Sequence, residues 1–359
     1  MPILVVNAGS SSLKLRLLDD GDRTLAQHEL DGTGGKVDQK ALESAVREAG
    51  RLDAVGHRVV HGGPRFAAAV RVDAGILRYL RSLTDLAPLH QPPSLGAIAD
   101  VGRLLPRVPA IACFDTAFHH GLPAPAATYA IPLEWRERWS IRRYGFHGLS
   151  HAYASRRAAE LLGTPLESLR LVTCHLGSGA SLAAVKGGLS VDTTMGFTPL
   201  EGLVMGTRSG TVDPGLLLWL IRRGKVSPAR LNDALETRSG LKALAGTADM
   251  REVLARPDAA PAVEVYLHRL RGLVAAMAAA MDGLDGLVFT GGIGEHSAPI
   301  RAGAAAGLGF LGVTLDPRRN EGRGDREIGR RGAAVRTLVV AAREDLEIAR
   351  QVRELLRAG

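Results

Sequence analysis

The sequence is poor in the residues on which several large classes of protein depend. It has two cysteines, Cys113 and Cys174, each inside an apolar run, a pattern typical of small buried side chains in a reducing compartment. Aromatic residues make up 4% of the chain, too few to provide the surfaces on which nucleic-acid bases stack. No apolar run is long enough to cross a bilayer, and no signal-peptide pattern is present. We therefore expect a cytoplasmic protein that binds neither nucleic acid nor a membrane.

Lysine is scarce as well. Six of the 45 basic residues are lysine and the other 39 are arginine, and the formal net charge is +8. Such a balance attracts polyanions, either nucleic acid or a small, highly anionic substrate, and the lack of aromatic residues favours the second. The chain has no G-x-x-x-x-G-K-[ST] loop, no protein-kinase motif set, no zinc-spaced cluster and no G-x-S-x-G elbow. Any nucleotide must therefore be held by other loops.

What the chain does contain is the pattern of a two-domain α/β protein. Its 359 residues suffice for two cores, and 46% of them are apolar. A strand, a glycine-serine turn and a second strand occur over residues 3–18, and the same order returns over 169–186. This repetition predicts a duplicated architecture, in which glycine turns let backbone N–H groups approach a phosphate. Two unrelated hairpins in an ordinary α/β chain are the alternative interpretation.

The rest of the chain divides into recognisable elements. Residues 19–40 have a loop-like composition, whereas 261–281 form a long apolar helix typical of a domain core or a dimer interface. Shorter elements are a helix at 41–50, a strand at 110–114, a helix from about 150 to 163, a helix capped by Asp213, a strand, glycine turn and helix at 284–301, and a C-terminal strand and helix.

Four polar side chains lie where chemistry is expected. Arg58 interrupts an apolar strand, and a buried guanidinium must pair or bind an anion. Asp115 directly follows a buried strand, at the end where α/β proteins bind ligands. His147 and Arg208 lie in loops. The alternatives are a structural ion pair for Arg58, a turn cap for Asp115 and a structural histidine at His147.

The chain resembles the acetate kinase family, also called the acetate/propionate kinases, through nine motifs in the family's order: VVNAGSSSLKLRL, GHRVVHGG, APLHQPP, FDTAFHH, RRYGFHGLSHAY, HLGSGAS, DTTMGFTPLEGLVMGTRSGTVDP, FTGGIGEHS and REDLEIAR. The resemblance implies two α/β domains of duplicated ribonuclease-H-like topology, as in the actin-type ATPases, with a nucleotide cleft between them. It assigns 1–117 and 344–359 to the N-terminal domain. It assigns 118–343 to a nucleotide-binding and dimerisation domain.

The same resemblance implies reversible, Mg²⁺-dependent in-line phosphoryl transfer from ATP to acetate by a homodimer, with Mn²⁺ as the alternative metal. The implied catalytic residues are Asp115, Arg58, His147 and Arg208. Asn7 and Glu344 would position the metal. Arg58 would also contact the substrate, whose methyl group would lie among Val60, Leu89, Phe146 and Pro199. The implied ATP-binding residues are Lys14, His175, Leu176, Gly177, Ser178, Gly179, Asp249, Met250, Arg251, Gly292, Ile293, Gly294, Glu295 and His296.

Some positions depart from the family pattern. Ser178 and His296 replace asparagines, and the terminal motif is Ala-Arg-Glu-Asp at 342–345 in place of Thr-Asn-Glu-Glu. The chain is also short between residues 19 and 52. We expect these changes to affect nucleotide affinity and peripheral or dimer contacts more than the chemistry. The rival functions are a propionate or butyrate kinase of the same family and a nucleotide-switched ATPase that uses no carboxylate.

Overall fold

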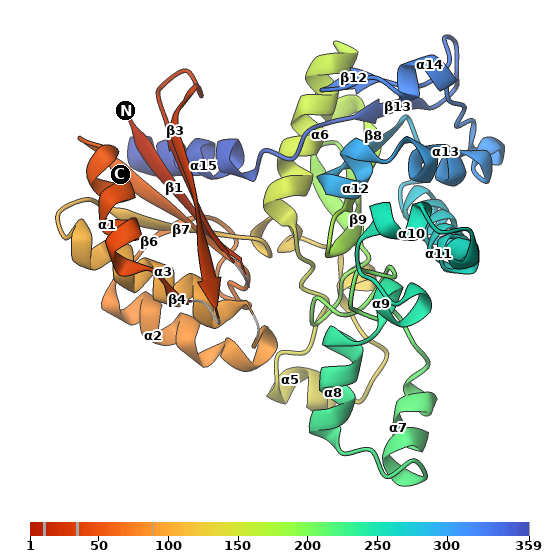
Figure 1. Ribbon diagram of the computed structural model, residues 1–359, viewed down its shortest axis with the longest axis horizontal. Coiled ribbons are helices and arrows are strands. Elements are labelled where there is room, and N and C mark those ends of the chain that lie inside the picture. The colour runs from red at the N-terminus through yellow and green to blue at the C-terminus, as the bar shows by residue number, and fades with distance from the viewer. Residues whose placement is uncertain (10–11, 34–35, 89, 359) are drawn as a thin grey trace. The chain divides into compact units, whose positions relative to one another are not determined.

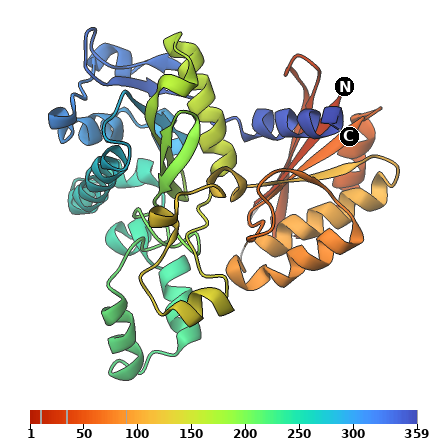
Figure 2. The ribbon, with the colours of Figure 1, turned by 180° about the vertical axis from the view of Figure 1, so that it is seen from behind.

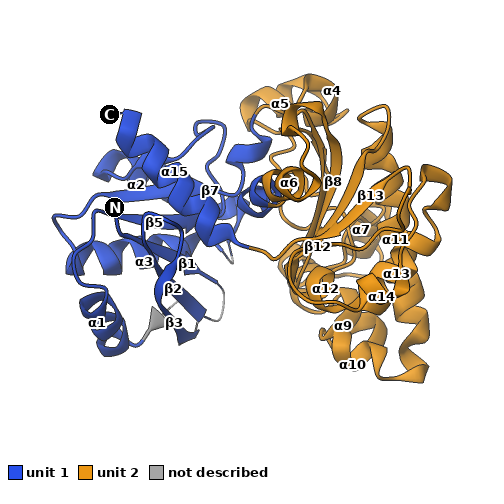
Figure 3. Cartoon of the chain, turned by 90° about the horizontal axis from the view of Figure 1, so that it is seen from above, with its two compact units in different colours: residues 1–120, 146–153, 343–359 blue, residues 121–145, 154–342 orange. Residues whose placement is uncertain are grey.

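The structure is a computed structural model that describes residues 1–9, 12–33, 36–88 and 90–358. Leu89, expected in the methyl pocket, lies outside the described residues. The chain forms two compact units (Figure 3): unit 1 comprises residues 1–120, 146–153 and 343–359, and unit 2 comprises 121–145 and 154–342.

These limits differ from the expected domains mainly at 146–153, which belongs to unit 1. Local contacts explain the difference. The backbone N–H of Gly148 donates to the carbonyl oxygen of Asp115 over 2.9 Å. Leu149 lies in the same apolar cluster as Ile111. The segment is therefore joined to the end of a unit 1 strand, which its position in the sequence does not reveal.

Among the described residues, unit 1 has a seven-stranded sheet in the order β4-β3-β2-β1-β5-β7-β6. The strands are β1 (Ile3–Ala8), β2 (Ser12–Leu18), β3 (Thr24–Thr33), β4 (Lys36–Val37), β5 (Ala54–Val59), β6 (Val70–Arg71) and β7 (Ala110–Phe114). β1, β2 and β3 pair antiparallel, whereas β1, β5 and β7 run parallel. The expected hairpin at 3–18 is confirmed.

The expectation of a loop over 19–40 is wrong, because β3 occupies ten residues of that segment. β3 pairs with β2 from Ser12 opposite Asp31 to Leu17 opposite Ala26, and Ala26 and Leu30 pack against an apolar cluster of the unit. Few of the other β3 residues are apolar, so the sequence pattern is weak. Pairing with a strong neighbouring strand decides the conformation.

Successive residues of β1 point to opposite faces of the sheet, as the pleat requires. Leu4 and Val6 pack with residues of α1 (Gln39–Glu48) and α3 (Gln91–Leu104). Ile3 and Val5 pack with residues of α15 (Glu344–Ala358). The C-terminal helix therefore completes the unit that the N-terminal strand begins, as Figure 1 and Figure 2 show from opposite sides.

The sheet of unit 2 repeats six of these seven strands in order and direction, and only β4 has no counterpart among its described residues. Its described residues form six strands in the order β10-β9-β8-β11-β13-β12. β10, β9 and β8 pair antiparallel, β8, β11 and β13 run parallel, and β12 returns antiparallel to β13, as β6 does to β7. The strands are β8 (Arg170–Leu176), β9 (Ala180–Lys186), β10 (Leu189–Thr193), β11 (Gly286–Thr290), β12 (Arg326–Glu327) and β13 (Arg336–Val339). The predicted duplication is confirmed.

Helices connect and cover these strands. The long apolar helix, α11 (Ala260–Ala279), packs against β8 and β9 and buries Tyr266, Leu270 and Val274. No helix in the described part of the chain is long and apolar enough to span a membrane. The other α-helices are α2 (Ala74–Ser82), α4 (Ala124–Ala127), α5 (Leu133–Arg138), α6 (Gly148–Leu162), α7 (Pro214–Arg222), α8 (Pro228–Thr237), α9 (Gly240–Ala245), α10 (Met250–Leu254), α12 (Gly291–His296), α13 (Ala298–Ala306) and α14 (Pro317–Asn320). Single 3₁₀ turns are Thr84–Leu86, Ala117–His119, Leu166–Ser168, Pro257–Ala259 and Gly309–Leu311.

Candidate active site

The parallel strands β5 and β7 bring Arg58 and Asp115 together in unit 1. Arg58 lies opposite Cys113 in the strand register, and Asp115 follows the last residue of β7. The Nε of Arg58 donates to Oδ1 and Oδ2 of Asp115 over 3.2 and 3.1 Å, and its Nη2 donates to Oδ2 over 2.7 Å. Asp115 is only 1% exposed. The pairing required of an arginine in an apolar strand is thus made within the unit.

Asn7 and Glu344 extend this pair into a chain of four side chains. The Nη1 of Arg58 donates to Oδ1 of Asn7 over 3.2 Å, and Nδ2 of Asn7 donates to Oε2 of Glu344 over 3.1 Å. Asn7 lies in β1, and Glu344 is the first residue of α15. The fold therefore joins two expected metal-site residues from the two ends of the chain with two expected catalytic residues.

Burial dominates the electrostatics of this network. It raises the pKa of Asp115, an effect that Arg58 opposes and Glu344 reinforces. Burial alone would lower the pKa of Arg58, but the charges of Asp115 and Glu344 outweigh it and raise that pKa. The guanidinium stays charged, and both carboxylate oxygens of Asp115 accept hydrogen bonds from it. This geometry suits a carboxylate that orients an arginine better than one that accepts a proton.

His147 lies in the loop before α6, in the left-handed region of backbone conformation with φ 56°. A non-glycine residue rarely adopts this conformation, which is concentrated at functional sites. The neighbouring Phe146 is buried, as is Val60. The Phe146 ring meets the His61 ring edge to face, with 5.5 Å between centroids. Val60 and Phe146, the two expected methyl-pocket residues that the structure describes in unit 1, are therefore both inside its apolar interior.

Lys14 has a different environment from the other expected residues of unit 1. It lies opposite Asn7 in the pairing of β1 with β2. Its side chain is exposed, and its Nζ lies 3.3 Å from Oε1 of Glu29, which is also exposed. The backbone of Lys14 thus flanks the charged network, while its ammonium group is paired at the surface of the sheet.

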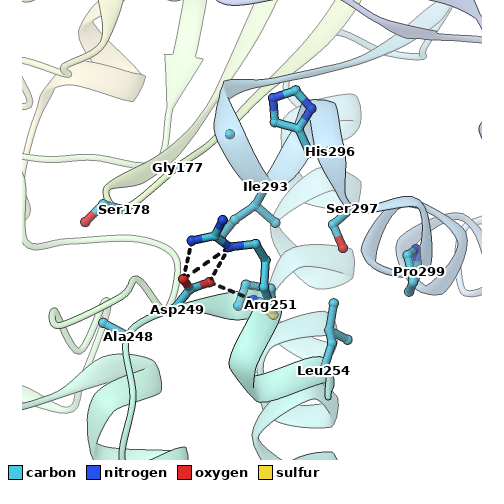
Figure 4. A pocket seen from close by; sticks show the side chains of 12 residues that line it. Gly177, Ser178, Ala248, Asp249, Arg251, Leu254, Ile293, His296, Ser297 and Pro299 are labelled. Atoms are coloured by element: carbon cyan, nitrogen blue, oxygen red, sulfur yellow. Dashed lines mark hydrogen bonds and ion pairs between the residues drawn. The ribbon is translucent and has the colours of Figure 1, made fainter. Parts of the chain in front are cut away.

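In unit 2, a pocket of about 720 Å³ brings together eight of the expected ATP-binding residues (Figure 4). These are Gly177, Ser178, Asp249, Met250, Arg251, Gly292, Ile293 and His296. They come from the β8–β9 turn, the start of α10, and α12. The volume is typical of a small-molecule site. His175, Leu176, Gly179, Gly294 and Glu295, also expected to bind ATP, do not line this pocket.

Four further residues line the pocket and were not predicted: Ala248, Leu254, Ser297 and Pro299. Each follows from helical or sequential spacing, since Ala248 precedes Asp249 and Leu254 comes one helical turn after Met250. The Oγ of Ser297 is buried and, among the described residues, has no hydrogen-bond partner. It is therefore a polar group that a bound ligand can satisfy.

Local sequence explains the walls of the pocket. Asp249 caps α10 by accepting the N–H of Arg251 over 2.8 Å, and the Arg251 guanidinium folds back onto the same carboxylate over 2.6 Å (Figure 4). This bonding by Arg251 lowers the pKa of Asp249 to about 2. Gly291, with φ 78°, is needed because a side chain there would meet the backbone of Leu176. The glycine brings α12 against β8.

Arg208 lies in the same unit, in the loop that follows Pro199. Its Nε lies 3.0 Å from Oε2 of Glu236, and its Nη1 donates to the carbonyl oxygen of Pro199 over 3.4 Å. Burial lowers the pKa of Arg208, and Glu236 opposes this shift. The structure thus places an expected catalytic residue beside an expected substrate-pocket residue. The sequence analysis did not predict Glu236.

The residues expected to hold a metal have the right donor atoms. Asn7 and Glu344 offer amide and carboxylate oxygens, the ligands that Mg²⁺ and Mn²⁺ prefer. In the described parts of the chain, no group of three or more histidine, cysteine, aspartate or glutamate side chains could hold a metal ion. Mg²⁺ commonly uses one or two carboxylates together with substrate phosphates rather than a cage built from protein alone. The residues therefore fit a metal that arrives with a nucleotide.

Comparisons with known proteins agree with this fold. The model of the acetokinase family matches residues 34–350. The chain is 44% identical to an acetate kinase of Gloeobacter violaceus over 405 residues, covering 99% of this chain and all of the relative. A propionate kinase from Francisella tularensis has a TM-score of 0.90 at 35% identity, covering 98% of each chain. The acetate kinase of Porphyromonas gingivalis has a TM-score of 0.89 at 34% identity, covering 99% of each.

Proposed function

The chain belongs to the acetokinase family, and from this membership we propose that it transfers a phosphoryl group reversibly between ATP and acetate, giving acetyl phosphate and ADP. The observation that supports this proposal best is the network of Asn7, Arg58, Asp115 and Glu344 in unit 1. We place the reaction in the cytoplasm, where the two free, buried cysteines stay reduced.

The chemistry needs charge stabilisation more than proton transfer. Acetate is already ionised at pH 7, so it attacks without a general base. A loose phosphoryl-transfer transition state spreads negative charge over the three equatorial oxygens, which suits arginine and histidine donors. In this proposal Arg58 and Arg208 bind the carboxylate and the transferring group, and His147 donates to the latter. Asp115 orients Arg58 and moves no obligatory proton.

The family uses ATP and a divalent metal, which we take to be Mg²⁺ with Mn²⁺ as the alternative. When bound, the metal neutralises phosphate charge, and Asn7 and Glu344 are the residues that would hold it. The pocket of unit 2 would hold the nucleotide. Its apolar side chains, Met250, Leu254 and Ile293, suit the base, while the glycine turn at 177–179 suits the phosphates.

The acceptor is tested by trapping acyl phosphate as hydroxamate from Mg-ATP with acetate, propionate and butyrate in parallel. One methylene is worth only about 1 to 3 kcal/mol in an apolar pocket, so acetate and propionate both react and butyrate reacts less. Rates that rise with chain length would instead favour a propionate kinase, which the likeness to the Francisella tularensis enzyme supports as second candidate. ATP hydrolysis without any acyl phosphate would point to a nucleotide-switched ATPase.

We further propose that the protein is a homodimer that uses α7. Asp213 caps this helix, and none of its residues is buried. Leu216, Leu218, Trp219 and Ile221 are all exposed large apolar side chains on its nine residues. Such a concentration is typical of an interaction surface. Light scattering tests it: Trp219→Glu should give monomers if α7 joins two copies, whereas Leu189→Glu, at an isolated exposed position, should leave the mass unchanged.

A further inference from the structure

Arg208 is held by an acidic side chain from a neighbouring helix. Glu236 is the second-last residue of α8, and its Oε2 lies 3.0 Å from the Nε of Arg208. The two side chains are 14% and 15% exposed, so both charges are largely removed from water. At this depth a guanidinium without a partner is costly, and Glu236 is the acidic group paired with it.

The backbone joins the same two elements around this ion pair. The hydroxyl of Thr207 donates to the carbonyl oxygen of Glu236 over 2.8 Å, and the N–H of Ser209 donates to that of Leu235 over 3.1 Å. Ser239 donates in turn to the carbonyl oxygen of Thr207 over 2.9 Å. Both chain neighbours of Arg208 are therefore fastened to the end of α8, the segment from which Glu236 reaches the guanidinium.

The contact is made at one particular nitrogen. Glu236 engages Nε, whereas the carbonyl oxygen of Pro199 accepts from Nη1. An anion that binds at the Nη end need not displace Glu236, because the two ends of a guanidinium point in different directions. Glu236 thus holds the Arg208 head group by charge from its Nε side, without competing for the same edge.

We propose that Glu236 is a positioning residue that holds the Arg208 guanidinium in register with the acceptor carboxylate and the transferring phosphoryl group. This role rests on the proposed function, in which Arg208 contacts both. The competing explanation is an ion pair that only docks α8 onto the unit.

Kinetics of Glu236→Ala and Glu236→Gln distinguish the two. Misplacing a positioning group by about 1 Å costs roughly 100-fold, so we expect Glu236→Ala to lower kcat/KM for acetate by about that factor. Glu236→Gln keeps the size and an acceptor oxygen, and should lose less. Nucleotide affinity of Glu236→Gln, measured by calorimetric titration with ADP, should stay near that of the parent.

Asp233→Asn is the matched control on the same helix. Asp233 forms an ion pair with Arg238 over 2.9 Å, but the two side chains are 56% and 49% exposed, so this pair is much more open to water than that of Arg208 and Glu236. This variant should retain the parent kinetics. If Glu236→Ala instead lost stability and nucleotide affinity in proportion to activity, or matched Asp233→Asn in keeping full turnover, the positioning role would be overturned.

Arg208→Lys tests the coupling directly, because lysine keeps the charge but has no Nε. Glu236→Ala should add little to the loss already caused by Arg208→Lys, and fully additive losses would contradict the proposal. Full turnover of Arg208→Ala would overturn the role that the proposed function gives Arg208. An inactive Arg208→Ala beside a normal Glu236→Ala would leave that role intact and overturn only the positioning role of Glu236.

Discussion

Strands β5 and β7 of unit 1 occupy the same places in their sheet as β11 and β13 of unit 2. In β5 a single residue is not fully buried, and it is Arg58, which pairs with Asp115 at the end of β7. All five residues of β11 are buried, and the strand runs into the glycine-rich start of α12 at the pocket. One topology therefore carries a partly buried charge network in one copy and a small-molecule-sized pocket in the other.

Removing the charge network should have the largest effect. We expect Arg58→Ala to lower kcat by roughly 10³-fold or more, as loss of an arginine that stabilises a phosphoryl-transfer transition state does. ADP affinity, which we assign to unit 2, should remain within about twofold in calorimetric titration. Because Ala leaves Asp115 buried without its partner, Arg58→Lys serves as the second variant, since it keeps the charge but loses the bidentate contact. Full turnover of Arg58→Lys, or equal losses of kcat and ADP affinity, would break the division between the units.

Asp115→Asn tests whether Asp115 orients Arg58 or transfers a proton. If Asp115 only orients Arg58, the pH profile of kcat keeps its shape and a substantial part of the rate remains. Near-complete loss of rate with unchanged metal affinity would instead make Asp115 an acid or base.

Filling the pocket of unit 2 should have a smaller effect, and it should change KM for ATP where loss of Arg58 changes kcat. Gly292 lines the pocket, and a side chain built there meets no other atom within 4 Å. Gly292→Phe should therefore fold normally, occupy the pocket and raise KM for ATP by about tenfold or more, the equivalent of roughly 1.4 kcal/mol. KM for acetate should stay constant. Gly309→Phe, also in open space but outside the pocket, is the control, and an unchanged KM for ATP in Gly292→Phe would remove the nucleotide from this pocket.

The sequence predicts those parts of the two units whose structure is determined by residues close together in the chain. The hairpins β1–β2 and β8–β9 and the cap of α7 at Asp213 were predicted, because glycine turns, apolar alternation and capping residues act within a few positions. The family was recognised from nine short motifs, and the match to the acetokinase model confirms it. The strand β3 and the placement of 146–153 in unit 1 depend on contacts with residues elsewhere in the chain, and the local sequence predicts neither.

The candidate site divides in the same way. Arg58 in a strand is conspicuous, because a charge there demands a partner. Glu236 at the end of α8 looks like an ordinary solvated helix residue until the loop at 207–209 is seen to cover it. Leu176 shows the reverse error: it lies within a glycine motif expected to bind ATP, yet it is fully buried in β8. Tertiary contacts, which the local sequence does not reveal, determine the environments of Glu236 and Leu176.

The comparison extends to stability against acid. Burial lowers the pKa of His57 to about 3, and those of His61 and His119 to about 4, from the ordinary 6.5, and all three belong to unit 1. Below pH 6.5 the unfolded chain binds protons that the folded unit does not, so the free energy of unfolding falls as the pH falls from about 6.5 toward about 4. Each histidine contributes a slope of up to about 1.4 kcal/mol per pH unit.

Hydrogen exchange at pH 7 and pH 5 checks this. Amides of β5 and β7 should lose protection on acidification before those of β8 and β11. His57 is the best variant, since neither ring nitrogen has a hydrogen-bond partner among the described residues. His57→Leu should remove the contribution of one histidine to the pH dependence of the free energy of unfolding. An unchanged pH dependence would show that this histidine is not involved.

The smallest effect is expected at the β8–β9 turn, where a substitution of Ser178 changes the side chain and keeps the backbone hydrogen bond. The family resemblance implies asparagine at the position of Ser178, and the carbonyl oxygen of Ser178 accepts the N–H of Gly206 over 3.0 Å, two residues before Arg208. Ser178→Asn adds amide donors at the pocket but leaves this backbone bond in place. A single hydrogen bond is worth about 0.5 to 1.5 kcal/mol net, so KM for ATP should fall by about two- to tenfold while kcat with acetate stays constant. A change in kcat would mean that the turn also moves the Arg208 loop, in which case nucleotide binding and acceptor chemistry are coupled within unit 2 through Gly206.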